Sequence, residues 1–149
     1  MYKTIVKNKV RGTFQALSEG RSEELIKQLA EPFVYEFIGD HALGGTQTSK
    51  DTMEKWFARI DQIFGRLQFK PLHIEVGGFP WNTTVLAEVE VSGTVAGEPY
   101  ENIIFQRIEL RMGKIHFIRT LENTQHLVDV FQKAHAAGVS EATKEPITD

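Results

Sequence analysis

The sequence contains no cysteine and has no excess of basic residues. The lack of cysteine excludes disulfide bonds, thiolate nucleophiles and cysteine-ligated zinc or iron–sulfur sites. The formal net charge is −3 at pH 7, so nucleic acid is not an expected partner. No apolar run reaches the roughly 18 residues of a membrane-spanning helix, and the polar start of the chain does not have the pattern of a signal peptide. We therefore expect a cytoplasmic protein without a membrane partner.

Motifs for metals and cofactors are missing as well. The five histidines do not have metal-ligand spacing, and the sequence contains no glycine-rich phosphate loop and no nucleophile elbow. We therefore expect no metal and no cofactor. Any chemistry must then come from the side chains of the chain itself.

What is present is the composition of one globular domain. The chain has 149 residues, of which 41% are hydrophobic and 25% are charged. A domain of this size buries about 68–70% of the surface that its unfolded chain exposes. Ten phenylalanines indicate a core that is rich in large, flat side chains.

The first part of the chain predicts two helices and a strand. Apolar residues recur at helical spacing over residues 6–17, and Gly20 ends this helix. Ser22 is expected to cap a second, short helix that stops at Pro32. The alternating residues 33–38 then predict a strand.

A third helix is expected after Thr48, which has capping-box spacing to Asp51. The apolar stripe of this helix is the strongest periodic signal in the sequence and comprises Met53, Trp56, Phe57, Ile60, Ile63 and Phe64. Thr124 is expected to cap a last helix. Residues 136–149 are small and polar, and we expect them to form a flexible tail.

Alternating apolar and polar residues predict a meander of strands before the last helix, over residues 72–76, 85–91, 100–111 and 115–121. Gly77–Pro80 is expected to break the first of these strands, and tight turns are expected at Ala96–Glu98 and Met112–Lys114. Strands joined by hairpins, with helices before and after, indicate an α+β fold. A twisted sheet that curls around helices would enclose a pocket for a small ligand. We assign residues 1–135 to this single domain.

The order of these elements and several short motifs resemble the nuclear-transport-factor-2-like superfamily over residues 5–134. Within it, the chain looks most like the SnoaL-like branch, which is related to polyketide cyclases and ketosteroid isomerases. The motifs are Gly39–Gly45, Trp56-Phe57, Tyr100–Asn102, Leu110–Ile115 and Glu122–Leu127. The resemblance implies a cone-shaped α+β barrel, in which a strongly curved antiparallel sheet packs on N-terminal helices and encloses a pocket. It also implies a homodimer that pairs through the outer face of the sheet.

The catalytic residues of the superfamily are not intact in this chain. The general base of ketosteroid isomerase-like members would fall near Phe37, with Asp40 three residues later, and their oxyanion-binding acid would fall near Gln106. SnoaL-like cyclases use an acid near the last strand, where this chain has Asn123 preceded by Glu122. The catalytic set of epoxide-hydrolase-like members corresponds to Glu88, Glu90 and Thr120. The resemblance therefore predicts the fold more firmly than any reaction.

Asp40 and His41 stand side by side in the loop after the first predicted strand, close to Gly44 and Gly45. An imidazole titrates near neutrality, and a neighbouring carboxylate can hold it charged or orient it. The pair could therefore transfer protons at the mouth of the pocket. Alternatively, His41 contacts a backbone carbonyl and Asp40 forms an Asx-turn.

Several further residues are candidates for binding a substrate. Asn102 and Gln106 lie on the otherwise apolar face of their predicted strand, which favours hydrogen bonds to a ligand in the pocket. Tyr35 could donate a phenolic hydrogen bond into the cavity, or its hydroxyl could be satisfied at the rim. Phe37 and Trp56 would contribute apolar contacts, Trp56 as part of the core.

The roles of Glu88, Glu90 and Arg119 depend on which face of the sheet lines the pocket. Glu88 and Glu90 share the polar face of their strand. Inside the cavity, low dielectric and like charge would raise the pKa of at least one of them, whereas on the outside they would be ordinary surface acids. Arg119 could orient an anionic or carbonyl ligand, or it could pair with an acid on a neighbouring strand.

We therefore expect a cofactor-independent acid–base enzyme of the isomerase, cyclase or dehydratase type. It would act on a small apolar carbonyl compound, with proton transfer by the His41/Asp40 pair. The alternative is a non-catalytic small-molecule-binding or interaction module of the same fold.

Overall fold

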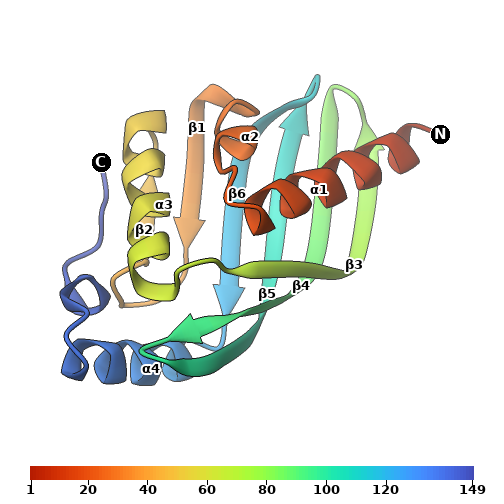
Figure 1. Cartoon of the computed structure of the whole chain (residues 1–149). Helices are drawn as coiled ribbons and strands as arrows, with labels where there is room; N and C mark the ends of the chain where they lie inside the picture. The colour runs from red at the N-terminus through yellow and green to blue at the C-terminus, as the bar shows by residue number, and fades with distance from the viewer.

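The computed structural model describes all residues from Met1 to Asp149. It contains four α-helices, six strands and one short 3₁₀ helix (Figure 1). In chain order these are α1 (Tyr2–Ser18), α2 (Glu23–Ile26), β1 (Leu29–Phe37), β2 (Gly45–Gln47), α3 (Lys50–Phe64), β3 (Gln68–Phe79), β4 (Asn82–Val95), β5 (Glu98–Arg111), β6 (Lys114–Glu122), α4 (Thr124–Ala136) and η1 (Ser140–Thr143). None of the helices combines the length and the apolar composition that crossing a bilayer requires.

The six strands form one curled sheet that does not close into a complete barrel. Their order is β2-β1-β6-β5-β4-β3, and every neighbouring pair is antiparallel except β1 and β6. Figure 1 shows α1, α2 and α3 over one face of this sheet, with α4 across the end at which β6 finishes. The predicted α+β cone is therefore confirmed, with an open rather than a closed sheet.

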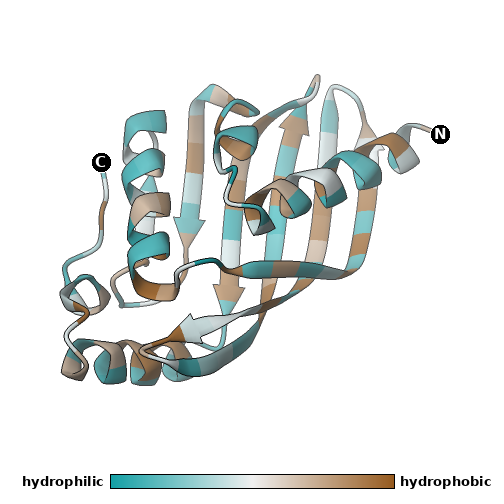
Figure 2. Cartoon of the chain, in the orientation of Figure 1, coloured by the Kyte–Doolittle hydropathy of each residue, from teal (hydrophilic) through white to brown (hydrophobic).

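Strand alternation decides which side chains face the helices. On β4, Val85, Ala87, Val89 and Val91 are buried on the inner face, whereas Glu88 and Glu90 lie on the outer face and are partly exposed. The same alternation appears as changing hydropathy along the strands in Figure 2. Because the apolar residues of the sheet meet those of α1 and α3, one continuous core of buried residues forms between the two layers.

The two predicted hairpin turns are confirmed. Ala96 and Gly97 have φ values of 51° and 81°, and Met112 and Gly113 have φ values of 50° and 80°. Two consecutive residues with positive φ are the signature of a type I′ turn, whose twist matches that of the strands it joins.

Several predicted boundaries are wrong by a few residues. Strand β1 begins at Leu29, so Pro32 lies inside the strand rather than before it. The prediction that Gly77–Pro80 breaks β3 is also wrong, because the strand continues to Phe79. Gly78 allows this continuation, since a Cβ there would lie 2.1 Å from the backbone oxygen of Asn82.

Ser22 is at the predicted N-cap position of α2, although its side chain forms no cap hydrogen bond. The other two predicted helix caps are one residue away from the observed ones. Ser49, not Thr48, caps α3, and its hydroxyl accepts a hydrogen bond from the Thr52 backbone N–H at 3.2 Å. Asn123, not Thr124, caps α4 by accepting from the His126 N–H at 3.1 Å. Serine and asparagine are both strong capping residues, so the corrections change the position of the caps but not their chemistry.

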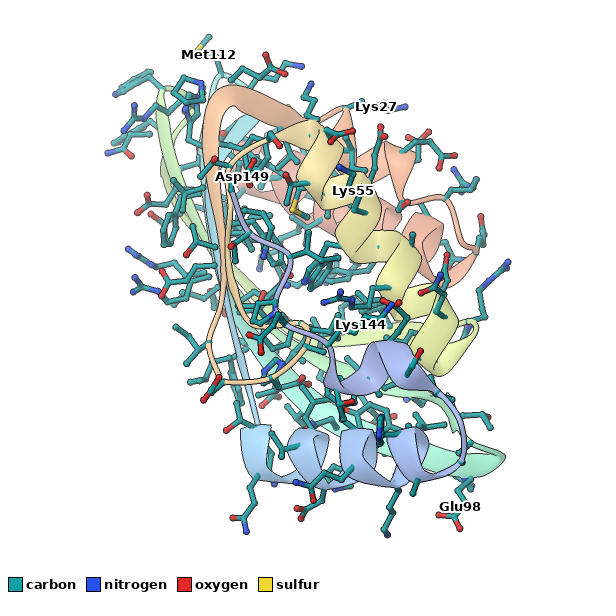
Figure 3. The ribbon with its side chains drawn as sticks, turned by 90° about the vertical axis from the view of Figure 1, so that its left-hand side faces the viewer. Lys27, Lys55, Glu98, Met112, Lys144 and Asp149 are labelled. Atoms are coloured by element: carbon teal, nitrogen blue, oxygen red, sulfur yellow. The ribbon has the colours of Figure 1, made fainter.

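The residues after α4 occupy a defined place beside α3 and β2, although the sequence predicts a flexible tail over 136–149. Within this segment, Ala142 is buried. The Gln47 side chain donates to the Ile147 carbonyl at 2.7 Å, and Asp149 accepts from the Thr48 N–H at 2.8 Å. Figure 3 shows the chain returning from η1 along α3 to Asp149. These contacts describe one arrangement of the segment, and its flexibility stays a prediction.

Candidate active site

A cavity of about 340 Å³ lies between the inner face of the sheet and helices α1 and α3. Of its 32 lining residues, 24 are hydrophobic. The volume is within the range of small-molecule sites, and such a lining favours an apolar ligand that makes a few directed polar contacts.

Most of the polar groups of the cavity gather toward the end of β6. The hydroxyls of Tyr35 and Thr120 are 3.2 Å apart, and Gln106 Nε2 donates to Thr120 Oγ1 at 2.9 Å. Tyr100 and Glu122 line the cavity as well. These five residues form what we call the polar corner. They come from three neighbouring strands, β1, β5 and β6, so the corner is built on a rigid part of the fold.

Glu122 is the only carboxyl group that lines the cavity. Its side chain points inward because Ile118 and Thr120 on the same strand also face the core, whereas Arg119 and Leu121 face outward. Burial raises the pKa of Glu122 to about 8, and the neighbouring Tyr100 hydroxyl opposes part of this increase. Glu122 forms no salt bridge, so no cation favours its charged form.

Two phenols accompany this carboxyl group. Burial raises the pKa of both Tyr35 and Tyr100, and the negative charge of Glu122 adds to the increase. Both side chains are therefore neutral hydrogen-bond donors throughout the physiological range. The Tyr100 oxygen accepts a hydrogen bond from Asn102 Nδ2 at 3.0 Å, and its phenolic proton is available to the Glu122 carboxyl group.

The sequence predicts that Asn102 lines the cavity. The residue is buried, but it does not line the cavity. Its Nδ2 atom donates hydrogen bonds to the Tyr100 hydroxyl oxygen at 3.0 Å and to the Asn123 carbonyl at 3.3 Å. Its Oδ1 atom accepts from the Ile103 N–H at 2.9 Å. Asn102 therefore orients Tyr100, and a role for Asn102 in binding a substrate stays a prediction.

His41 does not lie at the mouth of the cavity, so this prediction of its position is wrong. Its ring packs edge-on against Phe37 and Phe131, with centroids 5.1 and 5.9 Å away. Nδ1 accepts from the Leu43 N–H at 3.2 Å, and the buried Nε2 has no hydrogen-bond partner. Burial lowers the pKa of the imidazole, against the smaller opposing effects of the Ile38 backbone and Asp40.

The loop after β1 folds back on itself, and this path of the backbone places the His41 ring outside the cavity. Gly39 has a φ of 132°, and a Cβ at this position would lie 2.5 Å from His41 Nε2. Only glycine therefore lets the ring pack so closely beneath the turn. Asp40 is exposed, and it borders with His41 a separate hollow of about 210 Å³ between α4 and the C-terminal segment.

The other predicted site residues divide between the two faces of the sheet. Tyr35, Phe37, Trp56 and Gln106 all line the cavity. Trp56 is also held by a hydrogen bond of 2.9 Å from Nε1 to the Leu43 carbonyl. A role for these four residues in binding a substrate stays a prediction.

Glu88 and Arg119 are on the outer face, so their predicted place in the pocket is wrong. Glu88 is opposite the inward valines of β4. Arg119 forms a salt bridge of 3.0 Å with Glu36 on β1. Both outcomes match the alternatives that the sequence left open.

The sequence prediction missed Glu122 as a site residue. The signal was present, because Ile118, Thr120 and Glu122 alternate in phase on a strand whose inward face is otherwise apolar. The match to the family instead placed Asn123 at the acidic position, one residue further along. A shift of one residue moves a side chain to the other face of a strand.

No protein family model matches the chain, and no curated protein is similar to it in sequence. Solved structures with the same fold are numerous. The chain resembles PrhC from Penicillium brasilianum NBRC 6234 with a TM-score of 0.81 and 12% identity, and the match covers 94% of each chain. A protein from Jannaschia sp. CCS1, provisionally designated a SnoaL-like polyketide cyclase, aligns with a TM-score of 0.70 and 13% identity over 86% of this chain and 92% of that chain.

A third similar structure is a hypothetical protein with a ketosteroid isomerase-like fold from Catenulispora acidiphila DSM 44928, in complex with trimethylamine. It aligns with a TM-score of 0.65 and 18% identity over 76% of this chain and 83% of that chain. At these identities the likeness establishes the fold alone. It confirms that the chain has the SnoaL-like and ketosteroid isomerase-like architecture.

Proposed function

We propose that this protein is a cofactor-independent acid–base enzyme of the isomerase or cyclase type, acting on a small apolar carbonyl compound. The observation that carries the proposal is the carboxyl group of Glu122, which has a pKa of about 8 and lines an apolar cavity beside two neutral phenols. The proton-transfer group is therefore Glu122 and not the His41/Asp40 pair, because that pair does not line the cavity.

The pKa of Glu122 suits the removal of a proton next to a carbonyl. A general base works best when its pKa is near the operating pH, because a lower pKa gives a weaker base. With a pKa of about 8, roughly one Glu122 side chain in ten is ionised at pH 7, and the fraction rises as the pH passes 8. The rate of proton abstraction should rise with pH over the same interval.

The reaction follows from the positions of the donors. Ionised Glu122 takes a proton from the carbon next to the substrate carbonyl, and the electron pair moves onto the carbonyl oxygen. The resulting enolate accepts hydrogen bonds from the hydroxyl of Tyr100 or Tyr35 and from the second N–H of Gln106. In an isomerisation, Glu122 returns the same proton to another carbon. In a cyclisation, the enolate carbon attacks a second carbonyl carbon of the same substrate, the π electrons of that carbonyl move onto its oxygen, and this oxygen takes the proton that Glu122 holds.

The proposal includes a homodimer that pairs through the outer face of the sheet. Leu86, Phe105 and Leu121 are about half-exposed there, at 52%, 52% and 48%, although they are large and apolar. Phe105 and Leu121 are also direct cross-strand neighbours of β5 and β6. Large apolar side chains exposed on one face of a sheet are a common feature of protein–protein contacts.

The second candidate is a non-catalytic binding module. One observation favours it: Tyr35, Thr120 and Gln106 already satisfy one another by hydrogen bonds without a ligand. In that case the cavity would bind a small apolar molecule while Glu122 stayed protonated.

Hydrogen–deuterium exchange of ketones in D₂O tests the two candidates. Decalone and tetralone are incubated with the protein, and deuterium uptake next to the carbonyl is followed by NMR. We expect exchange above the buffer rate, with a loss of about 10²–10⁴-fold in Glu122→Gln. Glu88→Gln is the matched control, because it removes a carboxylate from the outer face. Binding of these ketones without exchange would support the binding module instead.

A further inference from the structure

Only two of the residues that line the cavity carry a formal charge, and they lie at opposite ends of it. Lys9 on α1 is next to the turn that precedes β6, because its Nζ donates to the Gly113 carbonyl at 3.1 Å. Glu122 is the last residue of β6. A nine-residue strand spans about 26 Å along its axis, so the cation and the acid lie near opposite ends of β6.

The Lys9 end is the mouth of the cavity. Ile5 and Met112 line it there and are 58% and 73% exposed. Two contacts hold α1 against the sheet at this end: the bond from Lys9 to Gly113, and a contact of 2.5 Å between the hydroxyls of Tyr2 and Thr83. Figure 3 shows Met112 at one end of the molecule and Glu98 at the other. The ammonium group of Lys9 is therefore fixed at the rim.

Lys9 has no anionic partner in the protein. It forms no salt bridge, and neither do Arg111 and Lys114, which flank the Met112-Gly113 turn. Helix α1 contains four basic residues and no acidic one. The mouth is thus a positively charged region on a chain whose net charge is −3, and it would attract anions.

We propose that the natural ligand is an elongated apolar molecule with an anionic group, such as a carboxylate, at one end. The anion binds Lys9 at the mouth, where it stays hydrated, and the apolar body fills the cavity. The reverse orientation is disfavoured, because it would place the anion in an apolar interior beside Glu122. The reactive carbonyl then lies at the polar corner. This assignment of the substrate class rests on the proposed function, but the binding step can be measured without turnover.

Calorimetric titration with decanoate and with the neutral ketone of the same chain length tests the proposal. We expect Lys9→Met to weaken binding of decanoate about fivefold and to leave binding of the ketone within a factor of two, because the lost contact is an exposed ion pair. The decanoate effect should shrink at high salt. Lys3→Met is the matched control, since Lys3 is exposed on the same helix, forms no ion pair and does not line the cavity.

The possible outcomes separate the two proposals. Equal effects of Lys9→Met on both ligands, or no effect on either, would overturn the anionic substrate class while leaving Glu122 chemistry intact. An effect on decanoate that Lys3→Met reproduces would also overturn it, because the attraction would then belong to the whole helix. Selective weakening of decanoate, with no ketone exchange by the wild-type protein, would support the ligand class and contradict the proposed catalysis.

Discussion

The polar corner and the Asp40–His41 loop differ in one decisive respect, which is access to the cavity. Both contain a titratable group beside aromatic residues, and burial shifts the pKa of each group toward its neutral form. Glu122 nevertheless lines the apolar cavity, whereas the His41 ring packs between Phe37 and Phe131 outside it. Side-chain chemistry identifies candidates, and the direction in which the backbone turns each side chain selects among them.

The difference has a structural cause. Glu122 is at the end of a regular strand, where alternation fixes its inward direction and the neighbouring strands fix its position. His41 is in a loop in which glycine conformations decide the direction of the ring. Two adjacent reactive residues in a loop are therefore weaker evidence for a site than one acid in phase with the apolar face of a strand.

The largest expected effects separate the two regions by activity. Glu122→Gln should lower ketone exchange by about 10²–10⁴-fold, whereas His41→Asn should leave it within about threefold of the wild-type rate. Asparagine is the matched replacement, because its Oδ1 can accept from the Leu43 N–H as His41 Nδ1 does. His41→Asn should instead lower stability by about 1–2 kcal/mol through lost packing, measured by urea denaturation. A large loss of exchange in His41→Asn with normal stability would return the catalytic role to the loop.

A smaller effect is expected in the dependence of stability on pH. Between about pH 4.5 and pH 8, folded Glu122 keeps a proton that the unfolded chain has released, so stability falls as the pH rises through this interval. The free energy of unfolding should fall by about 2–4 kcal/mol. One pKa unit corresponds to about 1.4 kcal/mol, and the total is reduced because Glu122 is partly exposed and therefore screened by solvent. Denaturation between about pH 6.5 and pH 8, above the interval in which His41 contributes, should show the fall in the wild type and not in Glu122→Gln.

His41 should make the stability of the protein depend on pH in the opposite direction. Its pKa is lowered in the folded state, so the unfolded chain binds more protons below about pH 6.5, and stability falls as the pH decreases there. His41→Asn should remove this loss on the acid side and leave the alkaline side unchanged. Identical pH profiles for the wild type and both variants would contradict the assignment of the two buried groups.

The sequence predicted the features that depend on local pattern. The Met112-Gly113 turn could be predicted because a short glycine-containing segment between two alternating stretches is typical of a tight hairpin, and the strand faces followed from alternation. What it could not provide depends on contacts between distant parts of the chain. Arg59 belongs to the buried face of α3 because it donates to the Ala42 and Glu145 carbonyls, and nothing near Arg59 in the sequence indicates these partners.

The same limit explains the error at the candidate site. The adjacency of Asp40 and His41 is visible in the sequence, but the packing of the ring against Phe131, ninety residues away, is not. The inward phase of Glu122 was visible too, yet its raised pKa results from the burial that the assembled sheet and helices create.

The most direct measurement of the central claim is a carbon-13 NMR titration of the Glu122 side-chain carboxyl in the intact protein, assigned with Glu122→Gln. We predict a titration midpoint about 3 to 4 pH units above that of an exposed glutamate, near pH 8. A midpoint near 4.5 would mean that Glu122 is fully ionised at neutral pH in a solvated setting, and it would contradict its role as the proton-transfer group.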